Sequence, residues 1–241
     1  VSDLYREWSF HGGIPETSFS RSWYERRKKQ WAGREIENLT LMAQEHPLFD
    51  EYWESKQAKL DRIKVPLYVG ASWSTQGLHN RGTLEGFKQS ASKYKWLEIH
   101  GRKDWEYYYS REAVERQKRF FDYFLKGIEN DWLDTPRVFL EVRERFYNGS
   151  FRFENEWPLA RTKYTKLFLD SAHSTMVTSS IKHENKISYN VDPDKTGERS
   201  AVFQMTFNKD TELTGYMKLK LWVSANGSDD MDLFVGIKKF D

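Results

Sequence analysis

A serine follows the first strand-like segment of the sequence. Residues 70–74, with the sequence GASWS, begin like G-x-S-x-G, the sharp strand-to-helix turn that exposes a nucleophilic serine. That turn needs small residues around the serine and a helix directly behind it. Here Ser74 replaces the last glycine, and the next helical pattern starts only after Gly77. We therefore expect the Ser72 and Ser74 hydroxyls to satisfy loop backbone rather than to attack a substrate.

Polar side chains follow two strand-like segments, 65–69 and 96–99. The loop at 70–81 contains Thr75, and the loop at 100–105 contains Asp104. Parallel strands end at one edge of a sheet, where ligands and catalytic groups collect. We expect the two loops to form a site together.

His100 is the candidate catalytic residue of the second loop. It directly follows a strand-like segment, and Gly101 behind it would allow close backbone approach, so His100 could act as a general base. A histidine in such a place is also commonly a structural residue. The residues alone leave both interpretations open.

The sequence gives no support for a metal or a cofactor. It has no cysteine, and its six histidines show no H-x-x-x-H, H-E-x-x-H or H-x-H spacing. Residues 229–232 (DDMD) lack the spacing of an EF-hand loop. The glycine motifs that cradle phosphates are absent. We expect no metal site and no cofactor.

Charge and hydropathy exclude further partners. The chain has 38 Lys+Arg and 36 Asp+Glu, and a net charge of +2 gives no reason to expect nucleic acid. The basic run at 26–29 is typical of a solvated face. Mean hydropathy is −0.83, and no apolar run approaches the ~18 residues that would span a membrane. No export signal opens the sequence, so we expect a cytoplasmic protein.

Residues 105–109 (WEYYY) concentrate aromatic rings beside the second loop. They could form a stacking platform for a sugar or a proline ring. Core packing at the start of a helix is the interpretation that we favour.

The hydrophobic pattern divides the chain into three parts. Helical spacing over about 34–63 indicates a cap-like segment at residues 1–64. Two buried strands, a helix at 82–92 and a helix from Ser110 to Gly127 predict a parallel α/β sheet in residues 65–131. On the last helix, Glu112 and Arg116 are spaced for an ion pair. After Pro136 the period changes from 3.6 to 2, which predicts an antiparallel jelly-roll β-sandwich over residues 132–241.

Several strings together resemble one family, the cocaine esterase and X-Pro dipeptidyl-peptidase α/β-hydrolases. The strings are residues 12–16 (GGIPE), 67–74 (LYVGASWS), 78–85 (LHNRGTLE), 117–127 (QKRFFDYFLKG), 221–224 (LWVS) and 230–235 (DMDLFV). The resemblance runs from about Phe10 to the end of the chain. It implies the second half of such an enzyme: the end of the helical cap, the last part of the hydrolase domain and a truncated jelly roll. The chain begins at Val1, and we expect it to be part of a longer polypeptide.

The resemblance also implies where a catalytic triad would lie. The family carries its nucleophilic serine upstream, so that serine is not in this chain. By alignment from the strands, Thr75 stands at the place of the acid and Asp104 at the place of the histidine, with His100 four residues early. A threonine cannot stabilise an imidazolium by charge. Either His100 and a displaced acid such as Asp104 rebuild the pair, or this branch has lost the chemistry.

Two functions follow as expectations. The first is part of a serine hydrolase that cleaves a small-molecule ester or an X-Pro peptide through an acyl-enzyme, with His100 as the base and the missing N-terminal hydrolase half as its partner. The second is a non-catalytic module of the same fold, with a degenerate triad, that binds a peptide, a sugar or another subunit. By itself, we expect this chain to be inactive. Family members often self-associate, so a homo-oligomer is a further expectation.

Overall fold

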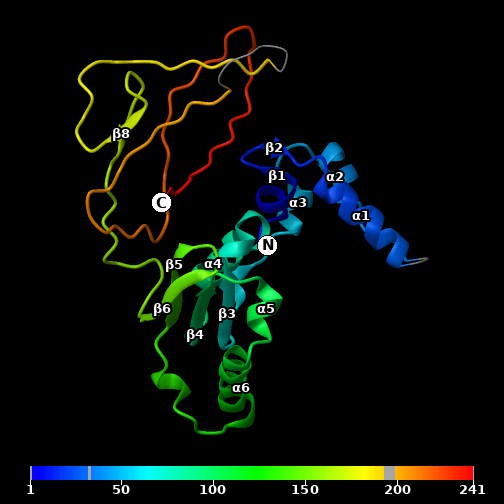
Figure 1. Ribbon diagram of the computed structural model, residues 1–241. Coiled ribbons are helices and arrows are strands. Elements are labelled where there is room, and N and C mark those ends of the chain that lie inside the picture. The colour runs from blue at the N-terminus through cyan, green and yellow to red at the C-terminus, as the bar shows by residue number, and fades with distance from the viewer. Residues whose placement is uncertain (1, 32–33, 193–198, 241) are drawn as a thin grey trace. The chain divides into compact units, whose positions relative to one another are not determined.

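The computed structural model describes residues 2–31, 34–192 and 199–240 (Figure 1). Its contacts divide the chain into two compact units. Val1–Trp157 and Leu219–Asp241 form the first unit, and Pro158–Lys218 form the second. All candidate site residues lie in the first unit.

Short helices make up the N-terminal region of the first unit. In chain order they and one small hairpin are η1 (Tyr5–Ser9), β1 (Phe10–His11), β2 (Ile14–Pro15), α1 (Phe19–Gln30), α2 (Leu39–Glu45), α3 (Glu51–Ser55) and η2 (Leu60–Arg62). The Asn38 side chain caps α2 and the Asp50 side chain caps α3, each by accepting two backbone N–H groups. The helical pattern expected over 34–63 is thus confirmed, and α1 is a helix that the sequence analysis missed.

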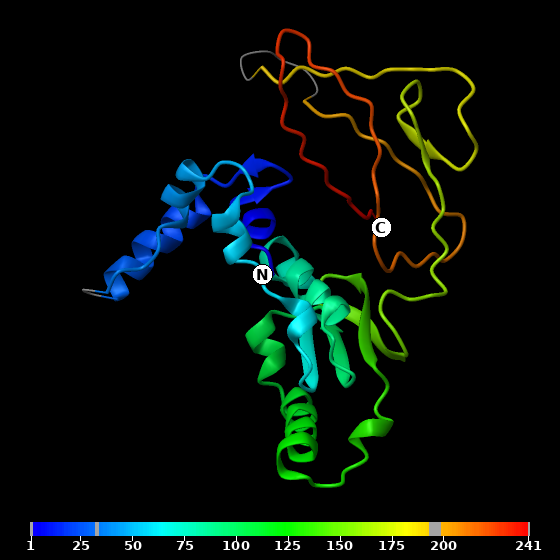
Figure 2. The same ribbon diagram turned by 180° about the vertical axis from the view of Figure 1, so that it is seen from behind.

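A four-stranded sheet carries the candidate site. Its strands, in spatial order, are β3 (Leu67–Ser72), β4 (Lys95–His100), β5 (Val138–Arg145) and β6 (Asn148–Glu154). β3 pairs with β4 and β4 with β5 in parallel, whereas β5 and β6 form an antiparallel hairpin. Figure 1 shows the four strands side by side, and Figure 2 shows them from behind. The expected parallel pairing of the two strand-like segments is confirmed.

The β5–β6 hairpin differs from expectation. We expected its alternating residues to open a separate sandwich at residue 132, but β5 instead continues the α/β sheet. Val138 and Leu140 on β5 are fully buried, as is Ile99 on β4. An alternating pattern shows that one face of a strand is buried, and it does not specify the sheet that buries it.

Helices follow the strands as expected for an α/β fold. They are η3 (Trp73–Thr75), η4 (Gln76–Asn80), α4 (Arg81–Gln89), α5 (Asp104–Tyr108), α6 (Arg111–Lys126) and η5 (Trp132–Asp134). Ser110 accepts the Ala113 N–H at the start of α6, and Gly127 ends that helix in the left-handed conformation at φ +67°. Trp96, Phe120 and Trp132 form a buried ring cluster between β4, α6 and η5.

One expected ion pair on α6 is replaced by another. Arg116 does not pair with Glu112 in the described structure; its guanidinium lies 2.5 Å from the Glu98 carboxylate of β4. Arg116 faces the sheet, where a buried carboxylate attracts it more strongly than an exposed neighbour on the same helix.

The second unit contains one small hairpin, β7 (Phe168–Asp170) with β8 (Thr175–Val177). Beyond Val177, the described residues add only an isolated bridge from Thr175 to Gln204. The jelly roll expected over 132–241 therefore stays a prediction. The expected domain boundaries also stay predictions, although β5, after the boundary at 131, pairs with β4 before it. Among the helices of the described residues, none has the length and apolar character needed to traverse a bilayer.

Candidate functional site

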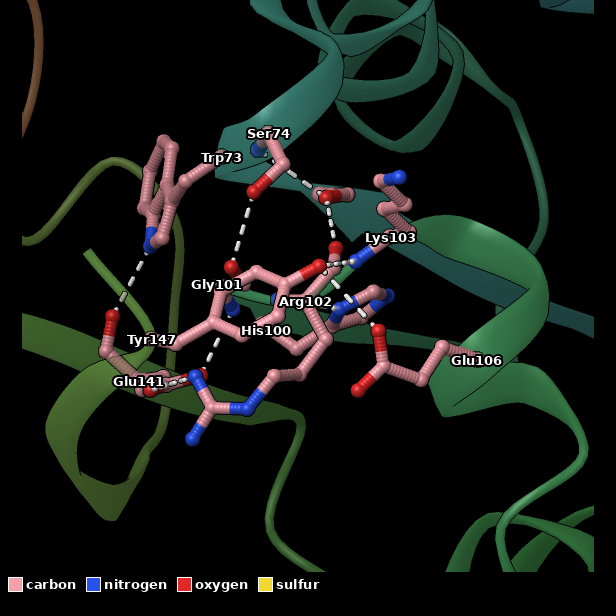
Figure 3. A network of polar contacts seen from close by, with 10 residues as sticks. Trp73, Ser74, His100, Gly101, Arg102, Lys103, Glu106, Glu141 and Tyr147 are labelled. Carbon is pink, nitrogen blue, oxygen red and sulfur yellow. Dashed lines mark hydrogen bonds and ion pairs between the residues drawn. The ribbon is translucent and has the colours of Figure 1, made fainter.

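The carboxyl ends of β3 and β4 bring the two predicted loops together. Ser72, the last residue of β3, lies opposite His100, the last residue of β4. Both loops therefore start at the same edge of the sheet, and Figure 3 shows the polar contacts between them. The convergence expected from the sequence is found.

The serine hydroxyls of the first loop bind backbone. The Ser72 hydroxyl donates to the Arg102 carbonyl oxygen and accepts the Ser74 N–H at 3.0 Å. The Ser74 hydroxyl donates to the Gly101 carbonyl oxygen at 2.8 Å. As expected, both serines hold the loops in place, and Ser72 is 1% exposed, too deeply buried to attack a substrate.

Thr75 and Asp104 meet across the two loops. The Thr75 hydroxyl lies 3.5 Å from Asp104 Oδ1 and 3.3 Å from the Ser72 carbonyl oxygen. The places that the family resemblance assigned to the triad acid and the triad histidine are therefore neighbours. A hydroxyl and a carboxylate occupy them.

His100 lies in a buried, stacked position. Its ring is parallel to the Tyr107 ring, with the centroids 3.9 Å apart, and His100 is 4% exposed. Its Nδ1 accepts the Arg102 N–H at 3.2 Å, so in the neutral ring the proton resides on Nε2. Burial lowers the pKa of His100, and the charges of Glu98, Asp104 and Glu141 oppose that shift only in part.

This geometry is opposite to that of a triad histidine. A triad histidine donates Nδ1–H to an acid and accepts the nucleophile's proton at Nε2. In His100 a backbone amide occupies Nδ1 as a donor. No carboxylate could orient the ring from that side.

Glu141 connects the strand β5 to both loops. Its side chain is fully buried; Oε2 accepts the Gly101 N–H at 2.6 Å, and Oε1 accepts from the Arg102 guanidinium at 3.1 Å. Its backbone carbonyl accepts the Trp73 indole N–H at 2.8 Å. The sequence analysis missed Glu141, whose signal in the sequence is an acidic residue between the apolar stretch 138–140 and Val142.

A second buried carboxylate lies under the site. Glu98 accepts hydrogen bonds from the Tyr68 and Tyr107 hydroxyls and from Arg116. Burial raises the pKa values of both tyrosines, and the Glu98 charge raises them further. Because Tyr107 also stacks on His100, the hydrogen bond from Tyr107 to Glu98 helps to hold the His100 ring in place.

The aromatic run at 105–109 is divided between core and surface. Tyr107 packs inside, whereas Trp105 is 65% exposed, Tyr108 53% and Tyr109 74%. The core packing that we favoured is therefore wrong for three of the four rings. Because α5 begins at Asp104, the exposed rings lie close to the site along the chain.

The described residues contain no group of three or more His, Cys, Asp or Glu side chains that could hold a metal ion. Two cavities, of about 140 and 340 Å³, lie on α1 and in the second unit. None of their lining residues belongs to the two loops.

Comparisons with known proteins point to one family. The sequence model of the X-Pro dipeptidyl-peptidase C-terminal non-catalytic domain matches residues 130–241. Two crystal structures of a CocE/NonD family hydrolase from Staphylococcus aureus are 52% identical to the chain, with a TM-score of 0.74. The chain belongs to the CocE/NonD hydrolase family. None of the curated proteins compared with it matches.

The match to the CocE/NonD structures is partial in both directions. It covers 76% of this chain and 33% of each solved chain, so the chain spans about a third of the length of those structures. It corresponds to a C-terminal part of a CocE/NonD hydrolase. Within that part, the Thr75–Asp104 pair and the stacked His100 form the candidate site.

Proposed function

We propose that this edge of the sheet binds a ring-bearing ligand, such as a proline-containing peptide or a sugar, without the acid–base relay of a serine hydrolase. The observation that carries this proposal is the 3.5 Å contact between the Thr75 hydroxyl and the Asp104 carboxylate. By the family resemblance, this hydroxyl and this carboxylate stand where acyl transfer needs an acid and an imidazole. The Thr75 hydroxyl cannot supply the charge of the triad acid, and the Asp104 carboxylate cannot supply the imidazole.

The chemistry of the relay supports this proposal. A serine is activated by a base whose pKa lies near the working pH, and that base is oriented by a charged partner. Thr75 supplies no charge, and His100 has its Nδ1 occupied by the Arg102 amide. Function depends on such a site rather than on the fold that carries it.

The exposed rings support the binding part of the proposal. Trp105, Tyr108 and Tyr109 present large apolar surfaces and follow Asp104 within five residues of the chain. Exposed aromatic faces with a polar group beside them are suited to a saturated ring that also offers a hydrogen-bond donor.

A serine hydrolase is the second candidate, favoured by the 52% identity to a CocE/NonD family hydrolase. In that case the polypeptide cleaves an ester or an X-Pro peptide through an acyl-enzyme. The serine comes from outside this chain, and His100 is the base after its ring has turned. In this second candidate, the helical cap and the jelly roll of the family enclose the acyl pocket and exclude solvent.

One set of variants separates the two functions in the full polypeptide that contains this chain. We expect the unaltered protein to resist labelling by a fluorophosphonate and to leave p-nitrophenyl esters and X-Pro anilides intact. The double variant Thr75→Asp with Asp104→His restores an acid and an imidazole at adjacent places. It should gain labelling.

Labelling of the unaltered protein that disappears in His100→Ala would establish the hydrolase instead. Binding is measured in parallel with a proline-containing dipeptide and with a monosaccharide. Trp105→Ala should lower the affinity for the ligand. Trp31→Ala, at an exposed tryptophan distant in sequence, is the matched control and should leave the affinity unchanged.

A further inference from the structure

The segment that the comparison describes as non-catalytic reaches into the candidate site. Glu141 lies within residues 130–241, yet its side chain and backbone contact both loops of the hydrolase part. We propose that Glu141 is a positioning residue, which fixes the loop from His100 to Asp104 and thereby the Thr75–Asp104 pair. The inference rests on the proposed function only in treating that pair as part of a ligand site.

The first step of the argument concerns both oxygens of the carboxylate. Oε2 accepts the Gly101 N–H at 2.6 Å, and Oε1 accepts from the Arg102 guanidinium at 3.1 Å. A fully buried carboxylate is costly unless such donors satisfy it. A glutamine has only one acceptor oxygen, so it can satisfy only one of these donors and turns its amide hydrogens toward the other.

The second step concerns the space around the carboxylate. A Cβ at Gly101 would lie 2.7 Å from Arg143 Cδ and 3.1 Å from Glu141 Oε2. A Cβ at Gly149 would lie 3.0 Å from Glu141 Oε1 and 2.5 Å from the Val142 carbonyl oxygen. The absence of side chains at two glycines leaves room for the loop and the carboxylate to approach each other.

The third step concerns the contacts between the loop at 100–105 and the loop at 70–81. The Gly101 and Arg102 carbonyl oxygens accept the Ser74 and Ser72 hydroxyls, and the Trp73 indole donates to the Glu141 carbonyl oxygen. Figure 3 shows that these contacts form one connected network. Thr75 directly follows Ser74, and Asp104 lies three residues after Gly101. We therefore expect a displacement of the Gly101 backbone to change the distance between Thr75 and Asp104.

The test is an amide spectrum of the full polypeptide, labelled with 15N at glycine and aspartate. In the unaltered protein the Gly101 amide proton, bonded to a carboxylate, should resonate far downfield and exchange slowly. In Glu141→Gln we expect that resonance to move upfield, its exchange to accelerate about tenfold or more, and the Asp104 amide to shift with it.

Glu154→Gln is the matched control. Glu154 is a buried carboxylate on β6 that pairs with Arg152 at 2.6 Å. Its removal should leave the Gly101 and Asp104 amides in place. Equal shifts in both variants would assign the effect to general loosening of the hairpin and overturn the inference.

Arg102→Met keeps the test decisive if Glu141→Gln does not fold. It removes one donor and leaves the carboxylate, so the Gly101 resonance should stay downfield while the Asp104 amide shifts. An unmoved Asp104 amide would contradict the inference. If the unaltered protein binds neither ligand while the Gly101 and Asp104 amides still shift in Glu141→Gln, the result contradicts the proposed function alone.

Discussion

At the scale of single residues, His100 shows how burial and one backbone contact determine the state of a histidine ring. Its ring is held by the Tyr107 face on one side and by the Arg102 amide at Nδ1. Both contacts depend on how the chain turns after β4. Sequence reasoning identified His100 as a candidate base, because a histidine behind a strand looks the same whether or not its nitrogen is occupied.

The lowered pKa of His100 makes stability depend on pH. When the pH falls below the ordinary histidine pKa of 6.5, His100 becomes protonated in the unfolded chain but stays neutral in the folded chain, until the pH reaches its lowered pKa. The contribution of His100 to the free energy of unfolding is therefore fully present above about pH 6.5. It is lost as the pH falls from there toward the pKa of His100 in the folded chain, with a slope of at most about 1.4 kcal/mol per pH unit. His100→Asn keeps an acceptor for the Arg102 amide and cannot titrate.

Urea unfolding at pH 5, 6 and 7 measures this effect. The free energy of unfolding should fall more steeply toward pH 5 in the unaltered protein than in His100→Asn. Parallel pH profiles would show that His100 titrates alike in the folded and unfolded states.

The Thr75–Asp104 contact was within reach of sequence reasoning. The two residues follow neighbouring strands of like direction, and the parallel register of β3 and β4 determines where both loops start. Glu141 was out of reach, because β5 lies about 40 positions further along the chain and its place in the sheet follows from tertiary pairing.

At the scale of elements, the close approach of β6 to β5 depends on Gly149, which lies opposite Arg143 in the hairpin. A Cβ there would lie 2.5 Å from the Val142 carbonyl oxygen and 2.9 Å from Arg143 Cα, both of which belong to the backbone. At Gly101 the nearest atoms belong to the Arg143 side chain, which can move. We expect Gly149→Ala to cost about 1–3 kcal/mol and Gly101→Ala to cost less.

Gly86 supplies the opposite expectation. It lies inside α4, and a Cβ there would meet nothing within 4 Å. Gly86→Ala should stabilise the protein by about 0.5–1 kcal/mol. Thermal and urea unfolding of the three variants checks the order; a Gly149→Ala protein as stable as Gly86→Ala would contradict it.

Elements with strong local signals were predicted well. In α6, Ser110 caps the start and Gly127 ends the helix. Of its apolar residues, Ala113 and Phe120 are buried, whereas Val114, Phe121 and Leu125 are exposed. α1 was missed because its sequence is polar around most of its surface.

Glu16 holds the first turn of α1 in place. Partial burial raises the pKa of Glu16, but the Ser20, Phe19 and Ser18 amides lower that pKa more, to about 2. The carboxylate therefore stays charged beside the amides at the start of the helix.

At the scale of the whole molecule, the sheet crosses the boundary that hydrophobic periodicity indicated. Trp132 completes the ring cluster with Trp96 and Phe120, and β5 pairs with β4. Periodicity located the change from helices to strands, and it could not show that the first strands after the change remain in the old sheet.

Truncation tests this continuity. A chain that ends at Asp131 lacks Trp132 and the β5 partner of β4, and we expect it to aggregate or to show no cooperative unfolding. A chain that ends at Trp157 keeps all four strands and should retain the near-ultraviolet circular dichroism of the ring cluster. Equal cooperativity of the two truncated chains would show that β5 and β6 add nothing to the sheet.

The tie between Glu141 and Gly101 also constrains how relatives of this chain can exchange parts by recombination. A junction at residue 130, where the C-terminal family match starts, would bring a carboxylate from one parent to a glycine and an arginine from another. Crossovers after Trp157 inherit strand, loop and carboxylate as one set. Hybrids joined at the later point should therefore be recovered as soluble protein more often than those joined at the earlier one.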